Sequence, residues 1–273
     1  ADNKIATTSS HVGRVPCTTK RVRTTSSRAV TTSELLFLAP AQISGSLTTA
    51  RVSINGASPI EVAAKINDFQ RMAKIPLLIS SDIEPGLGRL EGGVFAPNSY
   101  GGGSATILPN NMAIGATGDE RNAFEAGRIT GREAKAIGIH IAFAPVVDVN
   151  NNPANPVINT RSFGEDPDAV ARLSAAFVRG VQAAGVASTA KHFPGHGDTS
   201  VDSHKGLPVV AHSRKRLEEV EFVPFRKAVQ DGISAILTGH LLVPAIDPDR
   251  PATLSSKCLK GLLRKEWGFD GLI

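Results

Sequence analysis

The chain has little cysteine. Only Cys17 and Cys258 occur among its 273 residues, and they lie at opposite ends without a CxxC spacing. A disulfide framework or a thiolate metal site needs several cysteines at short, regular spacings. We therefore expect two free thiols and neither kind of site.

No apolar run is long enough to cross a membrane. A membrane-spanning helix needs about 18 consecutive apolar residues, whereas the segment 31–50 is interrupted by Glu34, Pro40 and many hydroxyl groups. The start of the chain also lacks the order of a secretory signal, in which a charged start leads directly into an apolar core. The sequence predicts no membrane span, and it indicates neither a cytoplasmic nor an exported location.

Positive charge is in excess, but the excess is confined to one end. Residues 1–54 contain seven Lys or Arg and two acidic residues, which accounts for the net charge of +5, and the remaining residues contain 23 of each sign. Grooves that follow nucleic-acid phosphates concentrate lysine and arginine. The balanced body of the chain therefore argues against a nucleic-acid partner.

The same residues 1–54 differ in composition from the rest of the chain. Ser or Thr occupies 18 of the first 53 positions, and only the short apolar segment ELLFLAP interrupts this basic, polar tract. No helical or alternating period runs through it. We predict no fold for this head, which could be a disordered leader, a transit-like segment or a segment that does not belong to the ancestral domain. We expect the folded domain at residues 55–273.

From residue 58 onward, helix signals alternate with strand signals. Ser58, Pro59 and Glu61 form a helix-capping signal, and Asp166 with Pro167 forms another. The strands are short continuous apolar runs, which are typical of parallel strands covered on both faces. We expect helices at 58–75, 119–137, 165–185, 213–230 and 255–266, and strands at 76–82, 141–149, 186–193, 233–243 and from 269.

This alternation predicts an α/β fold, either a (β/α) barrel or a doubly wound sheet. A nucleotide-binding doubly wound sheet needs a GxGxxG or GxxxxGK[ST] turn at the start of a helix, and the glycine-rich segment 86–93 opens no clear helix. In barrels, the loops after the strands build the active site. Polar residues gather at those positions, namely Asp82, Glu84, Asp148, Lys191, His192 and His240.

The segment KHFPGHGDTSVDSHKGLPVV, residues 191–210, packs three histidines, two lysines and two aspartates around glycine and proline. One interpretation is a metal site, because imidazole and carboxylate suit zinc or iron; its ligands would be His192, His196, Asp202 and His204. Pro194 and Gly195 prevent the helical presentation that such a pair of histidines uses in HExxH proteins. A second interpretation is structural, in which the side chains satisfy the backbone of the loop.

A third interpretation is acid–base catalysis by Asp202 and His204. Two positions apart in an extended loop, their side chains point the same way. The carboxylate would hold one ring nitrogen as a donor and stabilise the imidazolium when the other nitrogen takes a proton. A serine-type triad is disfavoured, because neither Ser200 nor Ser203 lies in a GxSxG elbow.

The spacing of KHFPGHG and DSH resembles the signature of the β-N-acetylglucosaminidases of glycoside hydrolase family 3, of the cell-wall-recycling type. FAPVVDV, TRSFGEDP and EWGFDGLI extend the resemblance over roughly residues 58–273. It implies a (β/α)8 TIM-type barrel, incomplete at both ends, a carbohydrate substrate, and no metal or organic cofactor. It implies nothing about the oligomeric state.

The resemblance also implies a reaction, the retaining cleavage of a terminal β-linked N-acetylglucosamine from muropeptides or chito-oligosaccharides. His204 would be the general acid/base and Asp202 its partner, while Asp82, Arg161, Lys191 and His192 would bind the sugar. Burying Lys191 and His192 unpaired at a strand end would cost several kcal/mol. The alternative roles are an Arg161–Asp166 ion pair in the loop and a capping role for Asp82.

In the family, the strand that begins WGFDGLI leads to the aspartate that attacks the anomeric carbon, so we expect this nucleophile just beyond Ile273. Without it the covalent step has no acceptor. We therefore expect a fragment of a longer enzyme that is marginally stable by itself. The alternatives are a family 3 β-glucosidase and an inactive sugar-binding remnant, and a histidine acid also leaves phosphorolysis open beside hydrolysis.

Overall fold

The computed structural model describes residues 34–40, 47–53, 58–88, 105–203 and 205–273, and for the first two of these segments it describes the backbone alone. Contacts group Thr31–Ile273 as one unit. Most of the predicted head, Cys17 and His204 lie outside the described residues. The predicted domain boundary after residue 54 stays a prediction.

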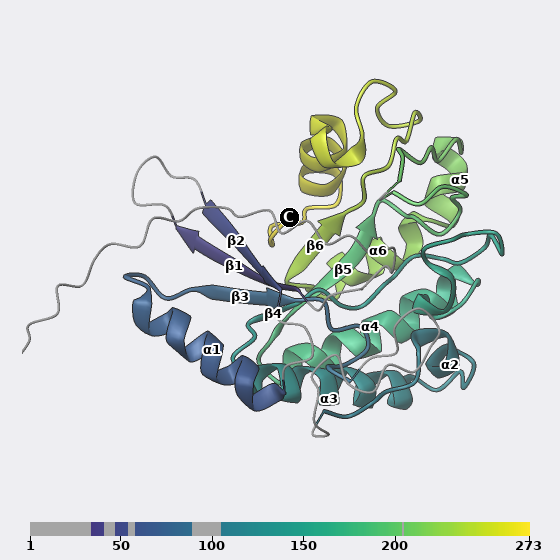
Figure 1. The fold of residues 1–273 in the computed structure, drawn as a ribbon. Helices are drawn as coiled ribbons and strands as arrows, with labels where there is room; N and C mark the ends of the chain where they lie inside the picture. Colours follow the sequence, from purple (N-terminus) through teal and green to yellow (C-terminus); the bar gives the residue numbers. More distant parts are fainter. Residues whose placement is uncertain (1–33, 41–46, 54–57, 89–104, 204) are drawn as a thin grey trace, which may run out of the picture. The chain divides into compact units, whose positions relative to one another are not determined.

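Six strands form one sheet in the order β2-β1-β3-β4-β5-β6 (Figure 1). They are β1 Glu34–Pro40, β2 Leu47–Ser53, β3 Leu78–Ser81, β4 Ile141–Ala142, β5 Ala187–Phe193 and β6 Ala235–Thr238. Strands β3 to β6 pair in parallel, which confirms an α/β fold with a parallel sheet. Leu272 forms a parallel bridge to Ala235 of β6. The predicted start of a further strand near the end of the chain is therefore also confirmed.

The pair β1–β2 is the part of the sheet that no sequence pattern predicted. Strand β1 coincides with ELLFLAP and pairs antiparallel with both β2 and β3. A parallel pair needs a crossover of about a dozen residues or more. The short connection 41–46 therefore allows only an antiparallel pair, and the described strands form an open row without closing into a ring among themselves.

Helices follow the strands in the predicted alternation. They are α1 Pro59–Met72, α2 Asn111–Gly115, α3 Glu120–Ala136, α4 Pro167–Ala183, α5 Arg214–Glu219 and α6 Phe222–Gln230, with 3-10 turns at Asn159–Arg161 and Ala252–Leu254 and a π-helical segment at Lys257–Glu266. The capping signals are confirmed. Glu61 N donates to Ser58 Oγ at 3.3 Å while Ser58 N donates to Glu61 Oε2 at 2.6 Å, and Ala169 N donates to Asp166 Oδ1 at 2.7 Å.

The prediction of one continuous helix at 213–230 was wrong, because the structure has two. Helix α5 ends at Glu219, Val220 leaves helical geometry with φ −129°, and α6 begins at Phe222. Pro224 lacks an N–H group, and in a continuous helix its ring would clash with the carbonyl of Val220 four residues earlier. The interruption places Glu221 at the N-cap of α6.

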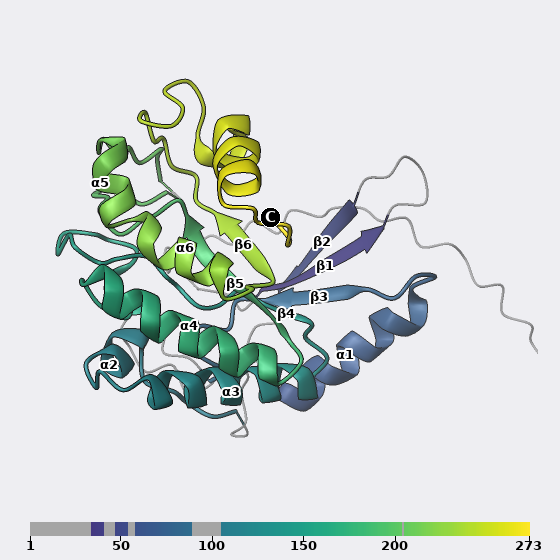
Figure 2. The ribbon, with the colours of Figure 1, turned by 180° about the vertical axis from the view of Figure 1, so that it is seen from behind.

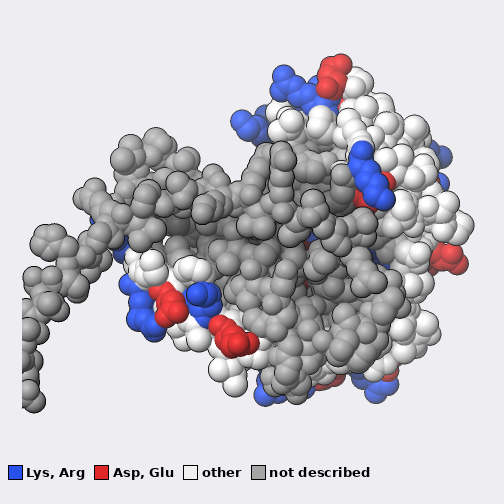
Figure 3. All heavy atoms as spheres, viewed as in Figure 1, with Lys and Arg blue, Asp and Glu red and all other residues white. Residues whose placement is uncertain are grey.

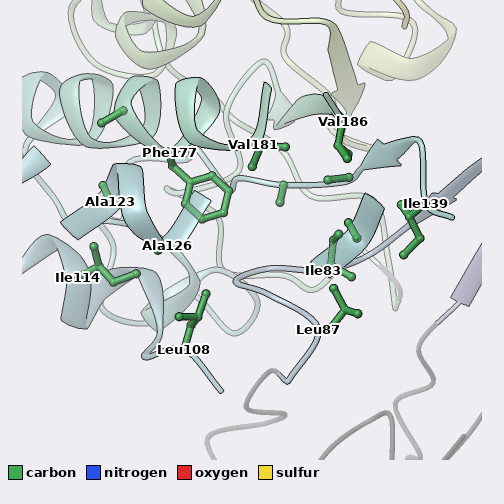
Figure 4. Packing of buried hydrophobic residues seen from close by; sticks show 14 of the residues in the cluster. Ile83, Leu87, Leu108, Ile114, Ala123, Ala126, Ile139, Phe177, Val181 and Val186 are labelled. Carbon is green, nitrogen blue, oxygen red and sulfur yellow. The ribbon is translucent and has the colours of Figure 1, made fainter. Parts of the chain in front are cut away.

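Buried apolar side chains form two clusters. The first surrounds Phe177 of α4 and includes Ala126 of α3 and Ile83 after β3 (Figure 4). The second surrounds Phe193, the last residue of β5, whose ring makes edge contacts with Phe225 of α6 and with Trp267, at centroid distances of 5.6 Å. Both views show α4 beside α3 and α6 (Figures 1 and 2). The second cluster fixes Phe193 at the end of β5. It therefore also fixes the position of the polar residues that immediately precede Phe193 in the strand.

Replacing Gly127 by Ala is expected to lower the free energy of unfolding by about 1–3 kcal/mol, the usual cost of overfilling a packed interior. A Cβ at this position of α3 would overlap the backbone carbonyl of Phe177 in α4. Urea unfolding measures the effect. Gly261→Ala is the matched control, because its added Cβ would meet only the Ser256 carbonyl, at 3.9 Å; equal destabilisation by the two variants would contradict the packing argument.

Three features of the described residues concern thiols, surface charge and membrane spans. Cys258 is a free, buried thiol. On the described surface that faces the viewer in Figure 3, Lys and Arg are interspersed with Asp and Glu. Within the described ranges, every helix is too short or too polar to cross a bilayer.

Candidate functional site

Lys191, near the end of β5, joins the ends of two strands. Its Nζ lies 2.7 Å from Oδ1 of Asp82 and 2.9 Å from Oε2 of Glu84, and both carboxylates follow β3. The carboxyl ends of parallel strands lie at the same edge of a sheet, which brings together residues 109 positions apart in the chain. Two of the predicted sugar-binding residues therefore meet, and Lys191 is buried as part of an ion pair.

Glu84 also holds Arg161, which lies in the 3-10 turn after α3. The guanidinium donates from Nε and Nη2 to Glu84 Oε1, at 2.8 and 2.5 Å. Burial alone would raise the pKa of Glu84, but the charges of Arg161 and Lys191 outweigh burial and lower this pKa to about 2. Glu84 is thus ionised at neutral pH. The alternative pairing of Arg161 with Asp166 is not adopted, since Asp166 caps α4.

Asp148 is a fully buried carboxylate. It organises the start of the loop that follows β5, residues 194–210, which we call the motif loop. Its Oδ2 lies 2.8 Å from Nδ1 of His192, and its Oδ1 accepts the N–H of His196 at 2.7 Å. Burial raises the pKa of Asp148, but the hydrogen bond from His192 and the nearby histidines lower it overall. Burial, together with the charges of Arg161 and Lys191, lowers the pKa of His192, although the hydrogen bond and charge of Asp148 act to raise it. His192 is therefore a neutral imidazole that donates from Nδ1 to the ionised Asp148. Its Nε2 is then a hydrogen-bond acceptor.

The solvent exposure of these side chains shows which of them a ligand can contact and which are buried beneath. The side chains of Asp82 and Arg161 are 39% and 33% exposed and that of His192 is 16% exposed, whereas Lys191 and Glu84 are 2% and 7% exposed. The accessible groups are a carboxylate acceptor, a guanidinium donor and an imidazole nitrogen. This combination is complementary to the hydroxyl groups of a sugar, which donate and accept hydrogen bonds.

Asn155 fixes the backbone of the motif loop by hydrogen bonds. Its Nδ2 donates to the carbonyl oxygens of His196 and Gly197, at 2.8 Å each. Gly197 passes so close to the backbone of Val149 that a Cβ would overlap its carbonyl group. These contacts fix the path of the loop toward the predicted catalytic pair.

Asp202, one member of that pair, is half-buried. Its carbonyl oxygen accepts the N–H groups of Lys205 and Gly206, at 2.9 and 3.1 Å, in a turn. His204 lies outside the described residues, so the pairing of the two side chains stays a prediction.

The structure gives a role to Glu84 and Asp148, which the sequence placed among the strand-end polar residues without a role. Their position directly after strands was the signal in the sequence, but their partners lie 77 and 44 positions away along the chain. Only the folded sheet brings these partners into contact. His240 belonged to the same strand-end group, and its Nδ1 lies 3.0 Å from Thr253 Oγ1.

Among the described residues, no group that could hold a metal ion includes His192, His196 or Asp202. Nδ1 of His192 is bonded to Asp148, and Nδ1 of His196 lies 2.7 Å from Thr199 Oγ1. The two rings meet edge to face, with centroids 5.9 Å apart. Both rings are therefore oriented by protein partners.

Two hollows in the described surface lie away from this cluster. One is lined by Arg226 and Trp267 among others, and the second by Thr106 and Glu133. Neither is lined by a predicted site residue. The candidate site is therefore identified by its polar geometry at the strand ends.

Comparison with known proteins identifies the family of the chain. Residues 37–273 match the model of the glycosyl hydrolase family 3 N terminal domain. A β-hexosaminidase A of Pseudoalteromonas piscicida is 40% identical over 218 residues, covering 74% of this chain and 35% of that protein. A β-N-acetylglucosaminidase/β-glucosidase of Cellulomonas fimi is 35% identical over 232 residues, covering 81% and 39%.

The similarity extends to solved structures. The structure of a glycoside hydrolase family 3 β-N-acetylglucosaminidase from Paenibacillus sp. str. FPU-7 superposes with a TM-score of 0.72 at 49% identity, covering 79% of this chain and 40% of that one. The chain thus spans 35 to 40% of the length of these three relatives. On the extent of the family match and the identity to these relatives, the chain belongs to glycosyl hydrolase family 3.

Proposed function

We propose that the chain carries the sugar-binding and acid–base parts of a retaining glycoside hydrolase that removes a terminal β-linked N-acetylglucosamine from muropeptides or chito-oligosaccharides. The observation that carries the proposal is the arrangement of Asp82, Arg161 and His192. Their polar groups are partly exposed at the strand ends and are held there by buried ionic partners. The names of the relatives support N-acetylglucosamine as the sugar.

We infer that the sheet is part of a (β/α)8 barrel. The parallel strands, the helices between them and the polar residues at the strand ends support this inference. The bridge of Leu272 to β6 indicates where the next strand of the barrel begins. Residues 55–273 are the proposed catalytic domain.

In the proposed reaction, His204 donates a proton to the glycosidic oxygen as the anomeric C–O bond breaks. An aspartate expected beyond Ile273 forms the covalent glycosyl–enzyme, and His204 then takes a proton from the water that hydrolyses it. Asp202 stabilises the imidazolium in both steps. Asp82, Arg161 and His192 orient the sugar ring by hydrogen bonds to its hydroxyl groups.

A β-glucosidase is the second candidate, because the Cellulomonas fimi relative carries both activities in its name. Hydrolysis of chromogenic N-acetylglucosaminides and glucosides by protein that extends through the expected nucleophile distinguishes the two. We expect turnover of the N-acetylglucosaminide and its loss in His204→Ala. Equal turnover of the glucoside would favour the β-glucosidase, and sugar binding without turnover would indicate an inactive sugar-binding barrel.

Replacing Arg161 by Lys is expected to weaken N-acetylglucosamine binding about tenfold or more. The variant keeps a positive charge beside Glu84, but it loses the planar guanidinium that pairs with Glu84 through Nε and Nη2 and is thereby held in place to present its remaining N–H groups to the sugar. Calorimetric titration with the free sugar measures the change. Arg128→Lys is the control, because Arg128 is paired with Glu125 on the exposed face of α3; unchanged affinity in Arg161→Lys would remove Arg161 from the sugar site.

A further inference from the structure

Three residues from three different segments converge beside the motif loop. Asp198 belongs to that loop, His212 precedes α5, and Glu221 is the N-cap of α6. One ligand atom of each lies within 4.8 Å of those of the other two, and His212 Nε2 lies 2.8 Å from Asp198 Oδ2. Within the described ranges, this is the one group of three or more His, Cys, Asp or Glu side chains that could hold a metal ion.

Glu221 is the member that points to a missing partner. The residue is 3% exposed, and its Oε1 is paired with Arg216 Nη2 at 3.3 Å. Its Oε2 is buried without a hydrogen-bond partner, as is Nε of Arg216. As the N-cap of α6 its side chain also accepts no N–H from that helix. A buried carboxylate oxygen needs a donor or a cation, because it has lost its hydration.

The two carboxylates of this group outnumber the one guanidinium beside it. Asp198 and Glu221 are two carboxylates, and Arg216 supplies the positive charge paired with Glu221. The side chains of Asp198 and His212 are 27% and 29% exposed, so an ion can reach the group from solvent. One imidazole and two carboxylates are a ligand set that suits zinc and similar divalent transition metals.

We propose that Asp198, His212 and Glu221 bind a divalent transition-metal ion of the zinc type. The ion takes one atom from each side chain and keeps a fourth position for water. Ligand atoms on a tetrahedral zinc ion lie about 3.4 Å apart, so the hydrogen bond between His212 and Asp198 opens by roughly half an ångström when the ion enters. The proposal does not depend on the proposed function.

The ion ties the motif loop to α6. Asp198 lies four positions before Asp202, and a Cβ on Gly195, earlier in the loop, would come within 2.8 Å of the Glu221 Cβ. A metal at this place therefore holds the loop at two adjacent points, by coordination at Asp198 and by packing at Gly195. The family resemblance implied a reaction without a metal or organic cofactor, and the proposed ion lies outside the residues predicted for that reaction.

Titration of the metal-stripped chain with zinc chloride tests the proposal. We expect one zinc ion per chain, a rise in Tm on adding zinc, and at least tenfold weaker binding in both His212→Ala and Glu221→Gln. The Gln variant keeps the size of the side chain and an acceptor for Arg216, so its folding is expected to be retained. Tm measured without zinc shows whether each variant is folded.

Asp202→Asn is the matched control, because it removes a carboxylate that a zinc ion at the predicted catalytic pair would use. Zinc binding at the proposed site is expected to survive this change. The proposal is overturned if the wild-type chain binds no zinc, if His212→Ala and Glu221→Gln bind it as the wild type does, or if only Asp202→Asn abolishes binding.

Discussion

Replacing Glu84 by Gln is expected to lower the free energy of unfolding by about 3 kcal/mol, at the low end of the cost of removing one partner from a buried ion pair. Glu84 lies between Lys191 and Arg161, with ion-pair distances of 2.9 and 2.5 Å. The variant leaves Lys191 with Asp82 alone and removes the ion-pair partner of Arg161, although the amide oxygen still accepts a hydrogen bond. Urea unfolding at neutral pH measures the loss.

The same carboxylate makes stability depend on pH. Its pKa is about 2 in the folded chain, against an ordinary value of 4.5. A depressed pKa adds stability that is fully present above the unfolded value and is lost as the pH falls through the folded value. The loss is therefore expected between about pH 4.5 and pH 2 and amounts to about 3 kcal/mol.

Glu84→Gln is expected to flatten this part of the pH profile, which a simple packing defect would not do. Glu125→Gln is the control, because Glu125 lies on the exposed face of α3 in an ion pair with Arg128, and surface pairs contribute little. An acid profile of Glu84→Gln parallel to that of the wild type would show that the buried charges do not control acid stability.

Replacing Asp148 by Ala is expected to cost about 3–5 kcal/mol of stability and to abolish measurable sugar binding. The change leaves Nδ1 of His192 and the backbone N–H groups of His192 and His196 without their acceptor in a fully buried position. The imidazole of His192 then loses the bond that fixes its tautomer and orientation. Thermal unfolding and calorimetric titration with N-acetylglucosamine measure the two losses.

Asp148→Asn separates stability from positioning. The amide keeps one acceptor oxygen but removes the charge that stabilises a proton on Nδ1 of His192. We expect a folded chain whose affinity for N-acetylglucosamine falls by about tenfold to a hundredfold, the range found for partners that orient a functional histidine. Wild-type affinity in a folded Asp148→Asn chain would limit Asp148 to a structural role.

The helices were the part of the fold that local sequence predicted best. The capping residues Ser58 and Asp166 start helices where expected, and the apolar stripe of α4 is buried. These features depend on interactions within a few positions of the chain. The break between α5 and α6 was missed although its cause, Pro224, is also local, because the apolar pattern continues across it.

The site was predicted in part. Asp82, Arg161, Lys191 and His192 were selected from strand-end position and family resemblance, and the structure places Asp82 and Lys191 in one ion pair with Glu84 and Arg161 beside them. The roles of these residues toward a sugar stay proposals. The sequence could not pair Glu84 with two cations, because those pairs depend on which strand ends become neighbours in the sheet.

The amino-acid sequence by itself determined the α/β class, the helix starts and the family, because caps, apolar periods and motif spacings are written in consecutive residues. Tertiary structure alone decided that β1 pairs with β3 and that Asp148 orients His192. It alone also brought Asp198, His212 and Glu221 together. The physical reason is the same in each case: a buried charge or an unpaired strand edge is stabilised by whichever partner the fold brings within bonding distance, and that partner lies far away along the chain.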